Sequence, residues 1–104
     1  MSNKANFKKI RSIVKVDKII ADNEVVEFKI GQTSNLMDRE NDYKNEGYTN
    51  FHKIAECDSA EELDNLERDL IRHFKGKSKC ANQNDGGGGK SSERNEYHIY
   101  VVTK

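Results

Sequence analysis

The segment from Ala60 to Lys75 constrains the fold more than any other part of the chain, because its pattern is that of a helix. Five apolar residues recur at helical spacing: Leu63, Leu66, Leu70, Ile71 and Phe74. At about 100° per residue these side chains sweep an arc of roughly 140°. Asp58 or Ser59 is placed to cap the helix, and Gly76 is placed to end it. The pattern therefore predicts an amphipathic helix with one face against a core.

Glu67 projects within this apolar arc, among the leucines and the isoleucine of the same face. A carboxylate that faces inward is costly unless a cation, hydrogen-bond donors or a metal ion pairs with it. Glu67 is therefore either a carboxylate at the rim of the core, paired with a lysine, or a candidate functional group.

The remaining segments alternate between strand-like and helix-like patterns. β-branched residues favour a strand over Ile10–Ile20, which a turn at residues 21–24 would connect to a second strand as a hairpin. The other predicted elements are a strand at Val25–Thr33, a helix at about Leu36–Asn45 capped by Ser34 or Asn35, and strands at Phe51–Cys57 and Glu96–Thr103. Residues 1–9 are predicted to be a flexible arm, and residues 84–95 a glycine-rich loop.

Arg39 gives the helix at Leu36–Asn45 an inward charge, because it projects between Leu36 and Tyr43. An arginine on one helix and Glu67 on the next indicate either a buried salt bridge or a shared polar cleft. Phosphodiester hydrolysis uses such a pair, since a carboxylate holds a divalent cation and a guanidinium binds phosphate oxygens bidentately. The two alternatives are not separable by sequence.

Composition limits the classes of partner. A chain of 104 residues has room for one domain, and its 18 basic and 18 acidic residues cancel, so bulk charge gives no argument for nucleic-acid binding.

Cys57 and Cys80 form no CxxC pair, which predicts reduced thiols and no zinc site. The chain has neither an apolar run long enough to span a bilayer nor an apolar leader, so we expect a cytoplasmic protein without a membrane partner. Abundant Asn, Lys, Asp and Ile, with no Pro, fit a phage or mobile element.

Three short motifs follow one another along the chain. Phe28–Asn35 reads as a strand that ends in Ile-Gly and is followed by a Thr-x-Asn turn, with Arg39 in the helix beyond it. Leu66–Phe74 is a helical segment that contains Glu67, and Cys80-Ala81-Asn82 precedes the tetraglycine Gly86–Gly89. The motifs span roughly Ile13 to Gly89. In their order and spacing they resemble the motifs of the GIY-YIG nuclease family.

The resemblance implies a single α+β domain over residues 1–104, with a small and mostly antiparallel sheet of three or four strands flanked by two or three helices. It also implies that Glu67 holds one Mg²⁺ or Mn²⁺ ion and that Arg39 binds phosphate. Thr33, Asn35 and Asn82 are expected to line the nucleic-acid-binding cleft, with Asn82 orienting the cleft and not performing chemistry. Lys90, beside the tetraglycine, would add a cation for a DNA phosphate.

Two departures concern the tyrosines of the family signature, which help to position or activate the attacking water. The counterpart of the first tripeptide is Ser12-Ile13-Val14, and Lys29 replaces the tyrosine of the second. Lys29 can act as a base only if burial or nearby cations favour its neutral form. Four tyrosines could substitute from another direction, with Tyr43 nearest to Arg39: Tyr43, Tyr48, Tyr97 and Tyr100.

The sequence therefore predicts a metal-dependent DNA endonuclease that hydrolyses phosphodiester bonds. Its expected catalytic residues are Arg39, Glu67, Lys29 and Tyr43. One alternative is a GIY-YIG-like module without catalysis that binds nucleic acid or a protein. Another is a small phage counter-defence protein. DNA is the expected partner, and a homodimer would allow both strands to be cut.

Overall fold

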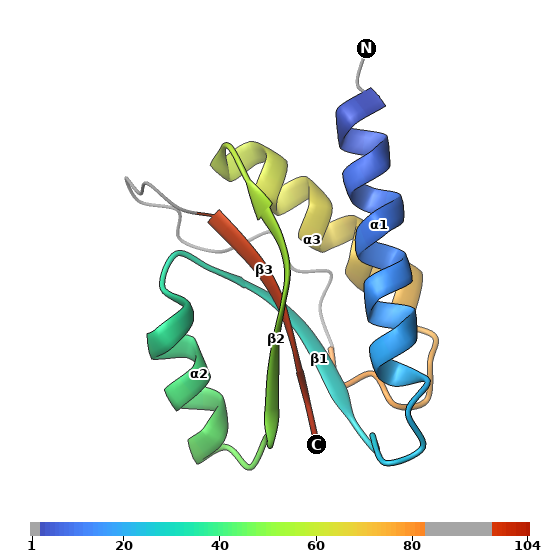
Figure 1. The fold of residues 1–104 in the computed structure, drawn as a ribbon, viewed down its shortest axis with the longest axis vertical. Coiled ribbons are helices and arrows are strands. Elements are labelled where there is room, and N and C mark those ends of the chain that lie inside the picture. Colours follow the sequence, from blue (N-terminus) through green and yellow to red (C-terminus); the bar gives the residue numbers. More distant parts are fainter. Residues whose placement is uncertain (1–2, 83–96) are drawn as a thin grey trace.

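The computed structural model describes residues 3–82 and 97–104 and shows three helices and three strands in that part of the chain (Figure 1). In chain order the elements are α1 (Asn3–Ile20), β1 (Phe28–Thr33), α2 (Leu36–Asn45), β2 (Asn50–Cys57), α3 (Ala60–Phe74) and β3 (Tyr97–Thr103). The predicted α+β fold, a small antiparallel sheet flanked by helices, is confirmed. The predicted loop at residues 84–95 lies outside the described residues.

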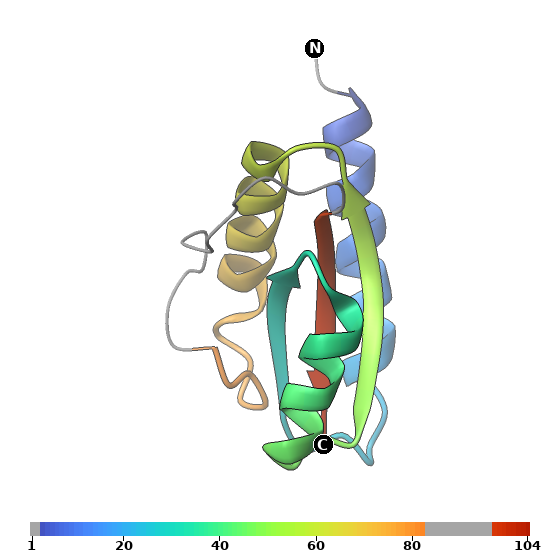
Figure 2. The same ribbon diagram turned by 90° about the vertical axis from the view of Figure 1, so that its left-hand side faces the viewer.

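The sheet has the strand order β1-β3-β2, so the C-terminal strand is central (Figure 2). Both neighbours pair with β3 in the antiparallel sense, and this register places Tyr100 opposite Gly31 on one side and Lys53 on the other. The register of β2 shifts between Lys53 and Ala55, where Ile54 is an extra residue. Because neighbours cover both edges of β3, and helices cover both faces of the sheet, the strand is buried from His98 to Thr103.

Two clusters of buried side chains cover the two faces of the sheet. Helices α1 and α3 pack on one face, where the rings of Phe28 and Phe74 meet edge to face with centroids 6.1 Å apart. Helix α2 packs on the opposite face, as Figure 1 shows. This second cluster consists of Tyr43, Tyr48, Tyr100 and Val102, with Phe51 beside it.

Helix α1 replaces two predicted features. The prediction of a strand at Ile10–Ile20 is wrong, and the predicted flexible arm over residues 1–9 is helical from Asn3. Val16 is fully buried, while Ile13, Ile19 and Ile20 pack against the same core. Their spacing of three or four residues is helical, and packing against α3 and β2 outweighs the strand preference of β-branched residues. The predicted turn at residues 21–24 is present, but it joins α1 to β1.

Helices α2 and α3 begin where the sequence predicts, each with a side-chain cap. Asn35 Oδ1 accepts a hydrogen bond from the Asp38 amide at 3.1 Å, and Ser59 Oγ accepts one from the Glu62 amide at 3.1 Å. The Glu62 carboxylate also accepts a hydrogen bond from the Asp58 backbone amide at 2.8 Å, so the first turn of α3 and the residues before it cap each other. The apolar face predicted for α3 is buried together with Glu67. The capped helix thus turns Glu67 toward the sheet.

Both cysteines are free thiols, as predicted. Burial, followed by the charge of Glu62, raises the pKa of Cys57 to about 12. In the described residues no three His, Cys, Asp or Glu side chains group as a metal site. No helix in that part of the chain combines the length and the apolar character needed to cross a membrane.

Candidate functional site

Glu67 is the buried carboxylate of α3, with 7% of its surface exposed. The side-chain amide nitrogen of Gln32, in β1, donates to Glu67 Oε1 at 2.7 Å and to Asp64 Oδ1 at 2.8 Å. One amide therefore joins two carboxylates that lie one helical turn apart. Sequence reasoning missed both Gln32 and Asp64. The signals were Asp64 three residues before Glu67, and Gln32 directly after Gly31 in the strand motif.

These two carboxylates fit a hard divalent cation. Mg²⁺ binds oxygen ligands and is commonly held by one or two carboxylates, with water and substrate phosphate completing its coordination. Glu67 and Asp64 supply anionic oxygens near the same point, since both contact one nitrogen. Two carboxylates alone leave coordination positions for water and a substrate phosphate, so Glu67 and Asp64 are the residues that could hold such an ion.

Tyr100 of β3 brings a hydroxyl to the opposite face of the sheet. It donates to the hydroxyl of Tyr43, in α2, at 3.1 Å, and the two ring centroids lie 5.6 Å apart. Gly31 makes this arrangement possible, because a β-carbon at that position would overlap the Tyr100 ring and hydroxyl. Burial and the hydrogen bond to Tyr43 raise the pKa of Tyr100 well above its ordinary value. Tyr100 therefore stays protonated and remains a donor.

Arg39 of α2 is partly exposed, with 49% of its side chain accessible. It forms an ion pair with Asp42 at 3.7 Å, so its guanidinium is not held in a buried salt bridge with Glu67. Two weaker electrostatic effects act on the Tyr100 hydroxyl. The charge of Arg39 lowers the pKa of Tyr100, and the charge of Glu67 raises it. The charges of Arg39 and Glu67 therefore both influence the Tyr100 hydroxyl, and the shared cleft expected between the two residues stays a prediction.

Lys29 of β1 lies on the α2 side of the sheet. Its ammonium nitrogen stands over the Tyr43 ring, 5.7 Å from the ring centroid. A cation over an aromatic face is attracted by the ring quadrupole. Tyr43 therefore faces two electropositive neighbours, the ammonium of Lys29 and the hydroxyl proton of Tyr100.

The strand expected to carry the first signature tripeptide is not at Ser12-Ile13-Val14. Ser12 is buried within α1, where its hydroxyl donates to the Lys8 carbonyl at 2.7 Å. The strand that pairs with the Ile-Gly strand is β3, and its residues His98-Ile99-Tyr100 end in a tyrosine opposite Gly31. A tyrosine thus occupies the neighbouring strand, but it comes from the far end of the chain.

Thr33 and Asn35 serve the turn between β1 and α2. Thr33 Oγ1 accepts from the Asn35 amide at 2.9 Å and donates to the Asn35 carbonyl at 3.1 Å. The Asn35 side chain caps α2. Their predicted contact with nucleic acid stays a prediction, and Lys90 lies outside the described residues.

Asn82 completes the outer edge of β1. Its Oδ1 accepts from the Ile30 amide and its Nδ2 donates to the Ile30 carbonyl, both at 2.9 Å. Just before it, the Phe28 amide bonds to the Lys79 carbonyl and the Ala81 amide to the Phe28 carbonyl. The Asn82 side chain therefore extends a short backbone ladder and holds the strand that carries Gly31 and Gln32.

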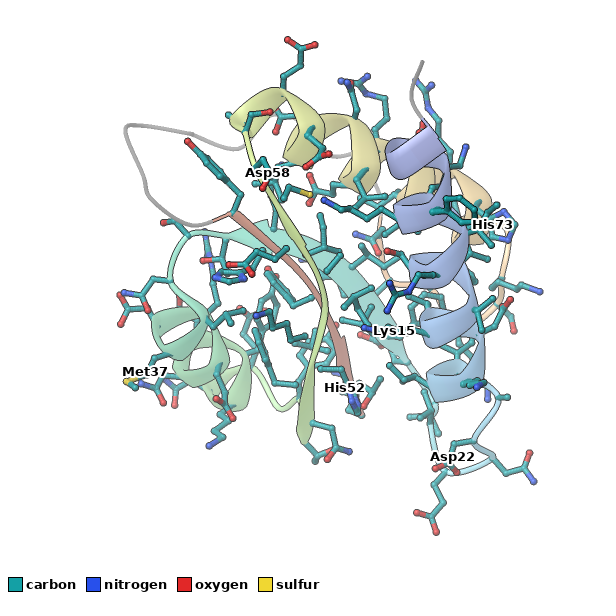
Figure 3. All side chains as sticks on the ribbon, turned by 45° about the horizontal axis from the view of Figure 1, so that its top comes forward. Lys15, Asp22, Met37, His52, Asp58 and His73 are labelled. Carbon is teal, nitrogen blue, oxygen red and sulfur yellow. The ribbon has the colours of Figure 1, made fainter. Side chains whose placement is uncertain are left out.

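A separate groove of about 610 Å³ lies between α1, β2 and the start of α3. Lys15 reaches from α1 toward β2 and donates to the Ile54 carbonyl at 3.1 Å (Figure 3). Lys8 forms an ion pair with Glu62 at 3.1 Å. None of the described site residues lines this groove, so the candidate site lies apart from it.

The fold and the site define a small α+β domain in which Gln32 of β1 joins two carboxylates of α3 and Tyr100 of the central strand packs over Gly31. Residues 13–102 match the model of the T5orf172 domain, and the chain belongs to this family. The domain is found in nucleases of phages and mobile elements and is related to GIY-YIG-like and HNH-type endonuclease folds. Membership indicates a nuclease-like or nucleic-acid-binding function. No curated protein and no solved structure matches the chain.

Proposed function

We propose that the chain is an endonuclease that hydrolyses DNA phosphodiester bonds with one Mg²⁺ or Mn²⁺ ion. The observation that carries the proposal is the placement of Arg39 and Glu67. They come from different helices, α2 and α3, and each has its own partner in Asp42 or Gln32. A cation and a phosphate can therefore be bound without first breaking a salt bridge between them.

Each charged group has a role that follows from its chemistry. Glu67, with Asp64 beside it, would hold the divalent ion, which supplies charge stabilisation at the leaving oxygen. Arg39 binds the scissile phosphate, because its planar guanidinium matches two phosphate oxygens and its exposed side chain can reach a ligand.

Because the tyrosines lie on the α2 face of the sheet and the carboxylates on the α3 face, we place the phosphate between them at the edge of β1, with the tyrosine pair orienting the attacking water. The water oxygen forms a bond to phosphorus, the bond from phosphorus to the leaving oxygen breaks, and the water proton passes to a base. We assign this proton to Tyr43 in its phenolate form, which takes the proton and becomes a neutral phenol; the hydrogen bond from Tyr100 and the Lys29 ammonium over the Tyr43 ring would offset the phenolate charge. Tyr100 is a positioning residue, because its raised pKa keeps it a donor toward Tyr43.

The test is cleavage of supercoiled plasmid DNA in Mg²⁺ or Mn²⁺. Glu67→Gln keeps the shape of the side chain and removes its charge, and we expect it to slow nicking by at least about 100-fold. Arg39→Gln should act similarly through loss of phosphate binding. Glu61→Gln, on an exposed position of the same helix, is the matched control and should cut at the native rate. A native protein that never nicks DNA, or a Glu67→Gln protein that nicks as well as native, would reject the proposal.

The second candidate is a T5orf172 module that binds DNA without cutting it. Two observations favour it. Tyr100 is buried with a raised pKa, and Lys29 stands where the family resemblance expects a second tyrosine. This candidate predicts metal-independent binding to DNA with no nicking, and loss of binding in Arg39→Gln but not in Glu67→Gln. The proposed DNA partner is common to both candidates, while the homodimer stays a prediction.

A further inference from the structure

Gln32 links the strand motif of β1 to the carboxylates of α3. Side chains alternate along a strand, and Gln32 falls on the same face as Phe28 and Ile30, toward α3. Its amide nitrogen lies 2.7 Å from Glu67 Oε1 and 2.8 Å from Asp64 Oδ1. An NH₂ group has two hydrogens, so these two bonds use its full donor capacity.

The two acceptors carry like charge. Residues at i and i+3 of a helix lie on one face, where two carboxylates repel each other. Glu67 is also buried, which makes its charge costly without donors. A single amide between the two oxygens offsets both effects and fixes the position of each carboxylate relative to β1.

We propose that Gln32 is a positioning residue, which holds Glu67 in the orientation that binds the divalent cation. The inference rests on the proposed function in one respect only, namely the role of Glu67 as a cation ligand. Groups that hydrogen-bond to a ligating carboxylate fix its orientation, and their loss typically weakens metal affinity by about 10–100-fold.

Glutamine suits this role better than other polar residues at the same place. A serine or threonine hydroxyl has one hydrogen and cannot donate to two carboxylates at once. A lysine would neutralise the carboxylates and compete with the cation for them. The amide is a neutral donor, so it orders Glu67 without cancelling the negative charge that attracts the ion.

The experiment is a calorimetric titration of the full chain with Mn²⁺, together with the Mg²⁺ concentration that gives half-maximal nicking. Gln32→Met keeps the length of the side chain and removes both donors. We expect the Mn²⁺ dissociation constant and the half-saturating Mg²⁺ concentration to rise by at least about tenfold. The nicking rate at saturating Mg²⁺ should stay within about threefold of native, because Gln32 acts through binding of the ion and not on the reacting atoms.

His52→Met is the matched control, because His52 is also a half-buried strand residue but lies on β2, away from α3 (Figure 3). It should bind Mn²⁺ as the native protein does. Gln32→Asn is a second variant in case Gln32→Met does not fold. It keeps the amide but is one methylene too short to reach both carboxylates, so we expect the same direction of change.

The outcomes separate this inference from the proposed function. Unchanged or tighter Mn²⁺ binding in a folded Gln32 variant overturns the positioning role, even if native protein cuts DNA. A lower melting temperature with an unchanged Mn²⁺ dissociation constant shows a purely structural role and also overturns it. Weakened Mn²⁺ binding in a protein that never cuts DNA supports the role of Gln32 while rejecting hydrolysis. A native chain that binds no Mn²⁺ overturns the inference.

Discussion

Gly31 and Tyr100 lie opposite each other in neighbouring strands, and the Tyr100 ring fills the space that a side chain on residue 31 would need. The requirement is one of space and not of backbone conformation, since the positive φ among the described glycines belongs to Gly47. With no β-carbon in the way, the Tyr100 hydroxyl reaches Tyr43. The Ile-Gly motif therefore has a physical reason at this site.

Gly31→Ala is expected to destabilise the fold. The added methyl group would overlap Tyr100, whose ring is packed between β1 and α2 and cannot move freely. Overpacking of this kind costs about 1–3 kcal/mol in the free energy of unfolding, measurable by urea denaturation. Gly76→Ala is the control, since nothing lies within 4 Å of an added β-carbon there. Equal stability of the two variants would show that Tyr100 does not need this space.

Removal of single hydroxyls should distinguish the role of Tyr43 from that of Tyr100. Tyr43→Phe leaves the buried Tyr100 hydroxyl without its acceptor, which costs about 1–3 kcal/mol of stability. Under the proposed function it also slows DNA nicking by about 100-fold, because the proton acceptor is lost. Tyr100→Phe should slow nicking less, since it removes only the group that positions Tyr43.

Tyr48→Phe is the control for this pair. Tyr48 belongs to the same aromatic cluster, but its hydroxyl donates to Glu27 at 2.6 Å and not to a residue of the candidate site. Its loss should reduce stability without slowing nicking. If Tyr48→Phe and Tyr43→Phe slow nicking equally, the tyrosine effect comes from the packing of the cluster and not from proton transfer.

Local signals were enough to predict α2 and α3, because their caps and apolar spacing lie within the segments themselves. They were misleading for α1. Ser12 lies on the buried face of that helix, with its hydroxyl satisfied by the Lys8 carbonyl, so a polar residue interrupts the apolar stripe. The many β-branched residues then favoured a strand, and only packing against α3 and β2 decides for the helix.

The central place of β3 depends on pairing between distant segments, and no local pattern encodes it. By sequence, the signature tyrosines therefore fall at Val14 and Lys29, although Tyr100 is the tyrosine opposite Gly31 in the structure. Glu67 is recognisable from its own position, as a charge on an apolar stripe, whereas Asn82 is recognisable only through the family resemblance. Gln32 is not recognisable in either way, because its role appears only when β1 meets α3.

Asn82→Ala should weaken the outer edge of β1. It removes two hydrogen bonds to the backbone of Ile30, and the partly buried amide and carbonyl would lose their partners. We expect a loss of about 1–3 kcal/mol in unfolding free energy and faster hydrogen exchange at the Ile30 amide. Asn50→Ala, on an exposed strand position, should leave exchange at Ile30 unchanged. Native protection at Ile30 in Asn82→Ala would show that the side chain does not hold the edge.

Glu62→Gln tests the cap of α3 through its pH dependence. The hydrogen bond from the Asp58 amide, and then that from Lys8, lower the pKa of Glu62 below its usual 4.5 despite partial burial. Because the folded pKa is lower than the unfolded pKa, the stabilisation is present above the unfolded value and is lost as pH falls through the folded value.

Glu62→Gln should therefore be about 1 kcal/mol less stable than native near neutral pH, and the difference should shrink as the pH falls below 4.5. Urea unfolding at near-neutral and acidic pH measures both values. Glu61→Gln, in the same helical turn but exposed, should show little difference at either pH. A deficit in Glu62→Gln that persists unchanged in acid would mean that its contribution comes from packing and not from the ionised carboxylate, because only the ionised form loses its advantage on protonation.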